Sequence, residues 1–206
     1  MITLSRTTLL VGLLALSATA NADVSANVGF SSDYYYRGFF QKSASVSAGV
    51  DYAQGGFYVG TWAADVGDGL EVDLYGGYGW EIGAVNLSAG FTGYYYTGDF
   101  DDTYQELNLG AGIAGLTLDV AVGEYDNFGG PTQNYTFASL TYEHNGFYAK
   151  YGDFSQDFSG SYFEAGYGTT VAEIDLIVSL ILSDSDITGD DSDEAIVLSI
   201  GKAFDF

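Results

Sequence analysis

Period-two alternation of residue type runs through almost the whole chain after Asp23 and constrains the fold more than any other feature. In residues 44–52, for example, apolar side chains alternate with serine, glycine and aspartate. Alternation over about ten residues is typical of a β-strand with two unlike faces. The pattern predicts about twelve strands. They are residues 24–36, 43–54, 56–64, 70–82, 84–96, 103–113, 115–125, 134–144, 146–153, 160–169, 173–183 and 194–206.

The connections between these strands fall into two alternating sets. One set is tight and in part carries the Gly or Asn-Gly that hairpin turns require: residues 54–56, 82–84, 114–115, 144–146 and 171–172. The other set includes longer, acidic segments: 97–102, 124–133, 153–160 and 184–193. Short turns at one end and long polar loops at the other are typical of an outer-membrane barrel.

A soluble β-sandwich also alternates, but its polar face would be rich in lysine, glutamate and threonine. Here the less apolar face carries glycine, serine, asparagine, tyrosine and carboxylates, and the whole chain has 5 basic residues. Aromatic residues also gather at both strand ends, which indicates two girdles at membrane interfaces. The long-loop set is Tyr34, Tyr36, Tyr94, Tyr95, Tyr96, Tyr104, Tyr125, Tyr135, Phe154, Phe158 and Tyr162. The short-turn set is Tyr52, Phe57, Tyr78, Trp80, Tyr142, Phe147, Tyr167, Phe204 and Phe206.

These features predict an all-β fold, a transmembrane antiparallel up-and-down barrel over residues 23–206. Residues 1–22 read as a cleaved signal peptide, because Arg6 precedes an apolar stretch at 9–16 and a small-x-small site ends at Ala22. We therefore expect Sec-type export to the bacterial outer membrane. Membrane lipid and lipopolysaccharide would then be the chain's surroundings.

Composition excludes several other classes of protein. A formal charge of −23 argues against nucleic-acid binding, which needs a basic surface. With no cysteine, the chain has no disulfide and no cysteine-ligated metal. The only histidine, His144, lies in an expected turn, so we expect no enzyme and no cofactor. The acidic segment from Asp184 resembles the start of a calcium loop, but Ala195 stands at its twelfth position, so a solvated loop is favoured.

The last strand ends in an aromatic residue, Phe206, with Phe204 two residues earlier and Gly201 five before the end. This arrangement resembles the C-terminal signal that the barrel assembly machinery reads in outer-membrane proteins. Lys202 falls on the lipid-facing parity, where a lysine near the rim can extend its ammonium to the headgroups. We therefore expect Gly201, Phe204 and Phe206 to act as an assembly signal.

Residues 32–38, SDYYYRG, together with Gln41 resemble the opening motif of the TorF family of bacterial outer-membrane porins. Residues 49–52, 56–62 and 71–78 continue the resemblance in order, and 104–107 resemble a later, weaker block. The departures are Phe40 in place of serine, no proline after Gln41, and Thr97 in place of proline. The resemblance implies a pore-forming barrel with no agreed substrate.

Twelve strands spaced about 4.8 Å apart and tilted about 40° close into a ring roughly 24 Å across, with a lumen on the order of 10 Å. Inward glycine and serine favour an open channel, whereas Tyr75, Tyr94, Tyr148 and Tyr162 would narrow it. The inward acidic residues are Asp33, Asp51, Glu71, Asp73, Glu81, Glu106, Asp119, Glu143, Glu164 and Asp175, and the inward basic residues are Arg37 and Lys150.

An acidic lumen attracts cations and repels anions. We therefore predict a water-filled diffusion channel for ions and small solutes that prefers cations. Pairing of Lys150 with Glu164 on the adjacent strand would make this preference slight. The alternative is a closed structural or adhesive barrel without transport activity, if the inward tyrosines fill the lumen.

Overall fold

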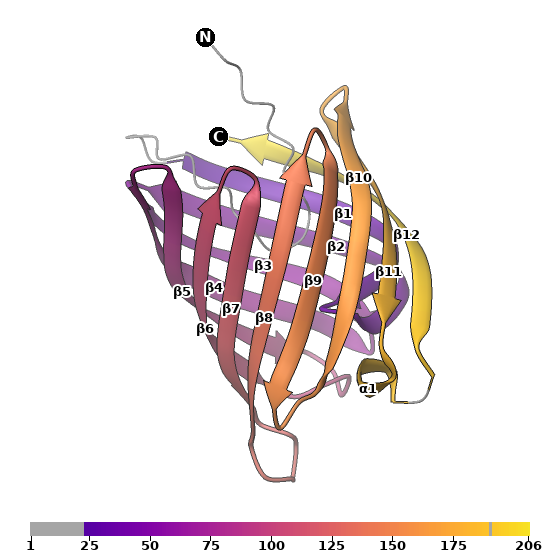
Figure 1. Cartoon of the computed structure of the whole chain (residues 1–206). Coiled ribbons are helices and arrows are strands. Elements are labelled where there is room, and N and C mark those ends of the chain that lie inside the picture. Colours follow the sequence, from indigo (N-terminus) through magenta and orange to yellow (C-terminus); the bar gives the residue numbers. More distant parts are fainter. Residues whose placement is uncertain (1–22, 190) are drawn as a thin grey trace.

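The computed structural model describes residues 23–189 and 191–206. The predicted signal peptide, residues 1–22, lies outside the described residues. Twelve strands and one short helix follow in order (Figure 1). They are β1 (Asp23–Tyr36), β2 (Phe39–Gln54), β3 (Phe57–Gly67), β4 (Gly69–Ile82), β5 (Val85–Tyr96), β6 (Tyr104–Ile113), β7 (Leu116–Tyr125), β8 (Gln133–His144), β9 (Phe147–Gln156), β10 (Gly160–Val171), β11 (Ile174–Ser183), α1 (Ser185–Thr188) and β12 (Asp193–Asp205).

Every strand pairs antiparallel with its neighbours in sequence, and β1 pairs with β12 to close the ring. At this seam Gly29 lies opposite Gly201. Closure leaves no strand edge with unpaired backbone groups. The predicted closed up-and-down barrel is confirmed, although β2 begins earlier and β9 ends later than the alternation indicated.

The tight turns lie together at one end of the barrel, which we call the short-turn end, and the C-terminus lies there too (Figure 1). Asn145 and Gly146 both have positive φ, +51° and +82°, as a primed two-residue hairpin turn requires. The opposite end, which we call the long-loop end, carries the connections at 97–103, 126–132, 157–159 and 184–192. Two connections there are also short, Arg37-Gly38 and the single residue Asp68.

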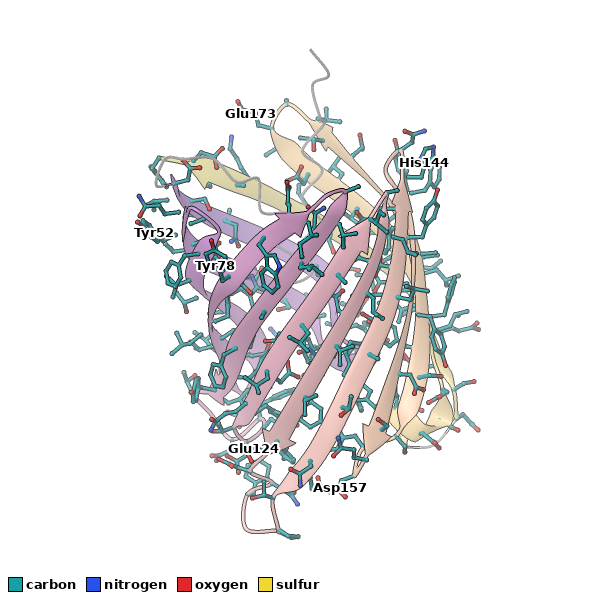
Figure 2. The ribbon with its side chains drawn as sticks, turned by 60° about the vertical axis from the view of Figure 1, so that its left-hand side comes forward. Tyr52, Tyr78, Glu124, His144, Asp157 and Glu173 are labelled. Carbon is teal, nitrogen blue, oxygen red and sulfur yellow. The ribbon has the colours of Figure 1, made fainter. Side chains whose placement is uncertain are left out.

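The outer wall of the barrel is apolar. Along β11, Val178, Leu180 and Leu182 are exposed, whereas Ser179 and Ile181 between them are buried. Figure 2 shows side chains projecting from the wall, with Tyr52, Tyr78, His144 and Glu173 at the short-turn end and Glu124 and Asp157 at the other. The buried core therefore lies inside the ring, and the hydrophobic surface faces outward. Among the described residues, no helical segment meets the length and hydrophobicity that a membrane-spanning helix requires.

Candidate functional site

The barrel interior is filled by side chains at the long-loop end. We call this set the interior cluster: Ala121, Tyr125, Tyr135, Phe137, Phe154, Tyr162, Ile181, Ile187 and Val197, with Tyr104 and Phe158 packed against it. Tyr104 stacks on Tyr125 with ring centroids 4.3 Å apart, and Tyr135 stacks on Phe158 at 4.9 Å. Ile187 comes from α1, so the β11–β12 connection contributes to the filling.

The predicted aromatic girdle at the long-loop end is therefore largely wrong. Most of its members point into the ring, and Tyr135, for example, is 2% exposed. Tyr34, Tyr94, Tyr96 and Tyr135 donate their hydroxyls to inward carboxylates, which lipid does not offer, and the two phenylalanines pack against these rings. The short-turn girdle is exposed on the outer wall as expected; Tyr78 is 51% and Phe147 is 64% exposed.

Arg37 and Glu106 form an ion pair at the centre of this filled region. The guanidinium donates from Nη1 to Oε1 at 2.5 Å and from Nη2 to Oε2 at 3.0 Å, a bidentate arrangement. Arg37 also lies over two aromatic rings, 4.9 Å from the centroid of Tyr36 and 4.3 Å from that of Phe137. The Glu106 side chain is fully buried.

Three further donors complete the shell of Glu106. Tyr135 Oη donates at 2.8 Å, Tyr94 Oη at 3.1 Å and Asn108 Nδ2 at 3.0 Å. Tyr36 Oη in turn donates to Tyr94 Oη at 2.6 Å. These residues come from β1, β5, β6 and β8, so one carboxylate gathers side chains from around the ring.

Glu71 on β4 is a second buried carboxylate with tyrosine donors. It is 1% exposed and accepts from Tyr34 Oη at 2.6 Å and from Tyr96 Oη at 3.0 Å. Asp73, two residues further along the same face, differs from it. One of its buried carboxylate oxygens, Oδ1, has no hydrogen-bond partner among the described residues.

Several inward glycines do not leave open space, as the sequence suggested, but make room for tyrosine rings. An added Cβ at Gly60 would meet the ring of Tyr75 at 2.6 Å, and one at Gly166 would meet the ring of Tyr148 at 2.5 Å. In both cases the tyrosine lies directly opposite the glycine on the neighbouring strand. A ring that lies flat over a glycine occupies the lumen instead of widening it.

The remaining predicted acids divide by height along the barrel. Asp51 and Glu164 are buried, and each accepts a tyrosine hydroxyl at 2.5 Å, from Tyr75 and Tyr148 respectively. Asp119 has one buried oxygen, Oδ2, without a partner in the described part of the chain. The other three lie toward the short-turn end: Glu81 and Glu143, which are exposed, and Asp175, which accepts from Thr170 Oγ1 at 2.5 Å.

Two expected features of the charges differ in the structure. Asp33 is half-buried, unlike the buried interior carboxylates, and accepts from Ser43 Oγ in an exposed pair next to the register shift between Tyr34 and Tyr35. Lys150 lies opposite Glu164 in the strand register, yet no ion pair joins Lys150 to a carboxylate within residues 23–189 and 191–206. The inner wall thus carries Asp51, Glu71, Asp73, Glu106, Asp119 and Glu164 against Arg37 and Lys150.

Sequence comparison assigns the chain to a family. The sequence profile of Gcw_chp, described as a bacterial protein of unknown function, matches residues 15–204. The chain belongs to the Gcw_chp family. No curated protein matches the sequence.

Two solved structures share the fold of this Gcw_chp member, and a third is less similar. One, from work on the in-meso crystallization of membrane proteins, has a TM-score of 0.63 at 10% identity and covers 89% of this chain and 84% of that one. The NanC porin has a TM-score of 0.52 at 11% identity, with coverage of 87% and 98%. OpdK from Pseudomonas aeruginosa, at a TM-score of 0.42 and 16% identity over 80% of this chain, is a longer protein of which 58% is covered.

No metal centre emerges from the geometry. In the described segments, no group of three or more histidine, cysteine, aspartate or glutamate side chains is placed to hold an ion. His144 is exposed, stacks on Tyr142 and shares a hydrogen bond with Asn145. The family member thus offers an interior network of carboxylates and tyrosines as its candidate site.

The predicted assembly signal lies on the last strand of this Gcw_chp chain. Phe204 is 41% exposed and Phe206 is 82% exposed. Lys202 Nζ donates to Glu173 at 3.0 Å and lies 5.4 Å from the Phe204 ring centroid. The role of Gly201, Phe204 and Phe206 in assembly stays a prediction.

Asp184 fixes the β11–β12 connection at the long-loop end. Its carboxylate accepts from the Ser161 backbone N–H at 2.7 Å and from Ser161 Oγ at 2.9 Å, and it caps α1 through the N–H groups of Asp186 and Ile187. Partial burial disfavours the charged form, but these donors outweigh it and lower the pKa of Asp184.

We expect Asp184→Ala to loosen this connection by about 1 kcal/mol, the usual cost of losing an N-cap. Digestion of folded protein within residues 184–192 should then be about fivefold faster at pH 7. Because the folded-state pKa is lowered, the stabilisation is present at neutral pH and is lost as pH falls below about 3.9. Asp186→Ala, which removes an exposed neighbour, is the control; equal digestion of both variants would contradict the assignment.

Proposed function

We propose that this protein is a bacterial outer-membrane channel that passes small cations and disfavours anions. An apolar outer wall around a closed ring of twelve strands supports placement in a bilayer. The fold shared with the NanC porin and the resemblance to the TorF porins support pore formation. A signal peptide at residues 1–22, Sec-type export and recognition of the last strand by the assembly machinery belong to the same proposal.

The main support for cation preference is the imbalance of charge on the inner wall. Six carboxylates face two cations there, and one of these cations, Arg37, is held by Glu106. Asp73 and Asp119 each keep an oxygen without a protein partner among the described residues. A cation that reached these buried oxygens would find acceptors that no described protein group occupies, and these could replace part of its hydration shell.

We expect purified protein in a planar bilayer with a salt gradient to give a reversal potential of the sign for cation selectivity. The double variant Asp73→Asn and Asp119→Asn should lower the cation-to-anion permeability ratio by roughly twofold or more, because it removes the two least satisfied interior charges. Glu124→Gln, at an exposed position near the rim, is the matched control and should leave the ratio unchanged. Anion selectivity of the unmodified protein would refute the proposal.

The filled long-loop end favours a second candidate, a closed structural or adhesive barrel. In that case protein shown to be folded, by heat-modifiable migration on SDS gels, would give no conductance above the bare bilayer. The same recordings therefore decide between the two functions.

A further inference from the structure

We infer that the Arg37–Glu106 ion pair is the constriction of this barrel, and that Arg37 sets how readily water and ions cross it. The inference rests on the proposed function for its conductance readout. The strand β6, which carries Glu106, is separated around the ring from the β1–β2 turn, which carries Arg37, by the three strands β3, β4 and β5. The pair therefore crosses the lumen instead of running along the wall.

The turn is held in place for this contact. Arg37 and Gly38 both have positive φ, +50° and +85°, and the Gly38 carbonyl accepts from Ser183 Oγ at 2.6 Å. An added Cβ at Gly38 would meet Tyr162 at 2.8 Å, so the turn sits directly on the interior cluster. A backbone fixed at both residues aims the guanidinium inward with little freedom.

Other contacts cross the ring at the same end and complete the closure. Tyr34 on β1 reaches Glu71 on β4, and Tyr36 on β1 reaches Tyr94 on β5. In these contacts the donor is a neutral tyrosine hydroxyl. The Arg37–Glu106 contact instead joins two opposite charges in the interior. Breaking it alone leaves a buried carboxylate without its counter-charge, which is the costliest defect in this layer.

Loss of the guanidinium is expected to admit water. The carboxylate of Glu106 retains its donors Tyr94, Tyr135 and Asn108, but its negative charge then needs hydration. Water enters most readily through the volume that the Arg37 side chain vacates. A hydrated path through this layer gives small cations a route past the interior cluster.

The test uses Ala121→Cys, which is 3% exposed on the inner face of β7 within the interior cluster. The natural chain has no cysteine, so this thiol is unique. Full-length barrels in lipid nanodiscs are treated with a small cationic methanethiosulfonate, and single-channel conductance is recorded in parallel. With Arg37→Gln added, we expect labelling to be faster by about tenfold or more, and conductance to rise.

Two control variants separate charge from disturbance of the fold. Lys42→Gln breaks an ion pair with Asp65 that also joins the long-loop ends of two strands but lies outside the interior cluster. This variant should change neither the labelling rate nor the conductance. The double variant Arg37→Gln and Glu106→Gln removes both charges, so no carboxylate at this position has lost its counter-charge and needs hydration. It should label much more slowly than Arg37→Gln alone.

The outcomes distinguish the inference from the proposed function. Labelling and conductance that are the same with and without Arg37 overturn the inference. Faster labelling with no conductance in any variant supports the constriction and overturns the channel. If the double variant labels as fast as Arg37→Gln, loss of side-chain volume explains the opening, and the role of the ion pair is refuted.

If Arg37→Gln does not fold, Arg37→Lys replaces it, because lysine keeps the charge without the bidentate fork. Its labelling should be faster than that of the Ala121→Cys chain with Arg37 intact, by less than the tenfold expected for Arg37→Gln. An unchanged rate overturns the inference.

Discussion

Replacing Glu106 with glutamine is expected to lower the free energy of unfolding by about 3 to 5 kcal/mol, the usual cost of breaking a buried ion pair from one side. The guanidinium of Arg37 would remain among the rings of Tyr36 and Phe137 without its counter-charge. The side-chain exposures of the pair, 14% for Arg37 and 0% for Glu106, leave little water to compensate. Reversible urea unfolding in lipid vesicles measures the change.

Glu173→Gln provides the matched control for this substitution. Glu173 makes the same kind of contact, a carboxylate accepting from Lys202, but its side chain is 84% exposed. An exposed ion pair contributes about 0 to 1 kcal/mol, so this variant should unfold nearly as the unmodified chain does. Equal loss of stability in the two glutamine variants would show that burial of the Arg37–Glu106 pair has no special weight.

The double variant Arg37→Gln and Glu106→Gln completes a thermodynamic cycle. Because it leaves no unpaired charge, it should recover much of the stability that Glu106→Gln loses. If the effects of the two single substitutions simply add, the two side chains act independently, and the ion pair is not the feature that stabilises this layer.

The wall of the barrel was predictable from sequence, whereas its filling was not. Alternation identifies strands because a lipid-facing side chain and an interior side chain differ in kind at every second residue. It placed Glu71 and Glu106 inward, and both are buried there. It gave no information on how far a side chain reaches across the ring. That reach depends on contacts between residues distant in sequence, such as Arg37 and Glu106, which are 69 positions apart.

Tyr75, Tyr94, Tyr148 and Tyr162 lie inward, as their parity predicts, but the other tyrosines at the long-loop end were largely assigned to the wrong surface. A tyrosine near a strand end fits a membrane interface and an interior carboxylate about equally well. Only its place in the inward–outward alternation of the strand indicates which of the two it faces. Parity fails near Tyr34, where the register shifts between Tyr34 and Tyr35. Arg37 was expected to line a pore, but a turn residue with positive φ brings it into the centre of the ring.

A usable signal was nevertheless present in the alternation. On the inner face, glycines lie directly opposite tyrosines on the neighbouring strand. The pairs are Gly60 with Tyr75, Gly77 with Tyr58, Gly123 with Tyr135, Gly152 with Tyr162 and Gly166 with Tyr148. Glycine in a strand weakens it unless something packs closely over the bare backbone. Read as pairs, these glycines indicate a filled interior; read singly, they indicated an open one.

Gly77→Ala tests this packing directly. An added Cβ would clash with the Ala89 carbonyl oxygen and would meet Tyr58 Oη at 2.5 Å and the Gly90 Cα at 2.7 Å. Two of these three atoms belong to the backbone of β5, which cannot move without disturbing the ladder. We expect a loss of about 1 to 3 kcal/mol in the free energy of unfolding, the usual range for overpacking.

Gly112→Ala is the matched control, on the inner face of β6. An added Cβ there would find Thr117 Oγ1 at 3.6 Å and the Leu116 carbonyl oxygen at 3.7 Å, which are ordinary contacts. Because alanine restricts the unfolded chain more than glycine does, this variant should be unchanged or more stable by about 0.4 to 1 kcal/mol. Opposite signs for two glycine-to-alanine changes on one inner wall would show that close neighbours, Tyr58 Oη among them, cover Gly77; equal effects would mean that the space over Gly77 is open.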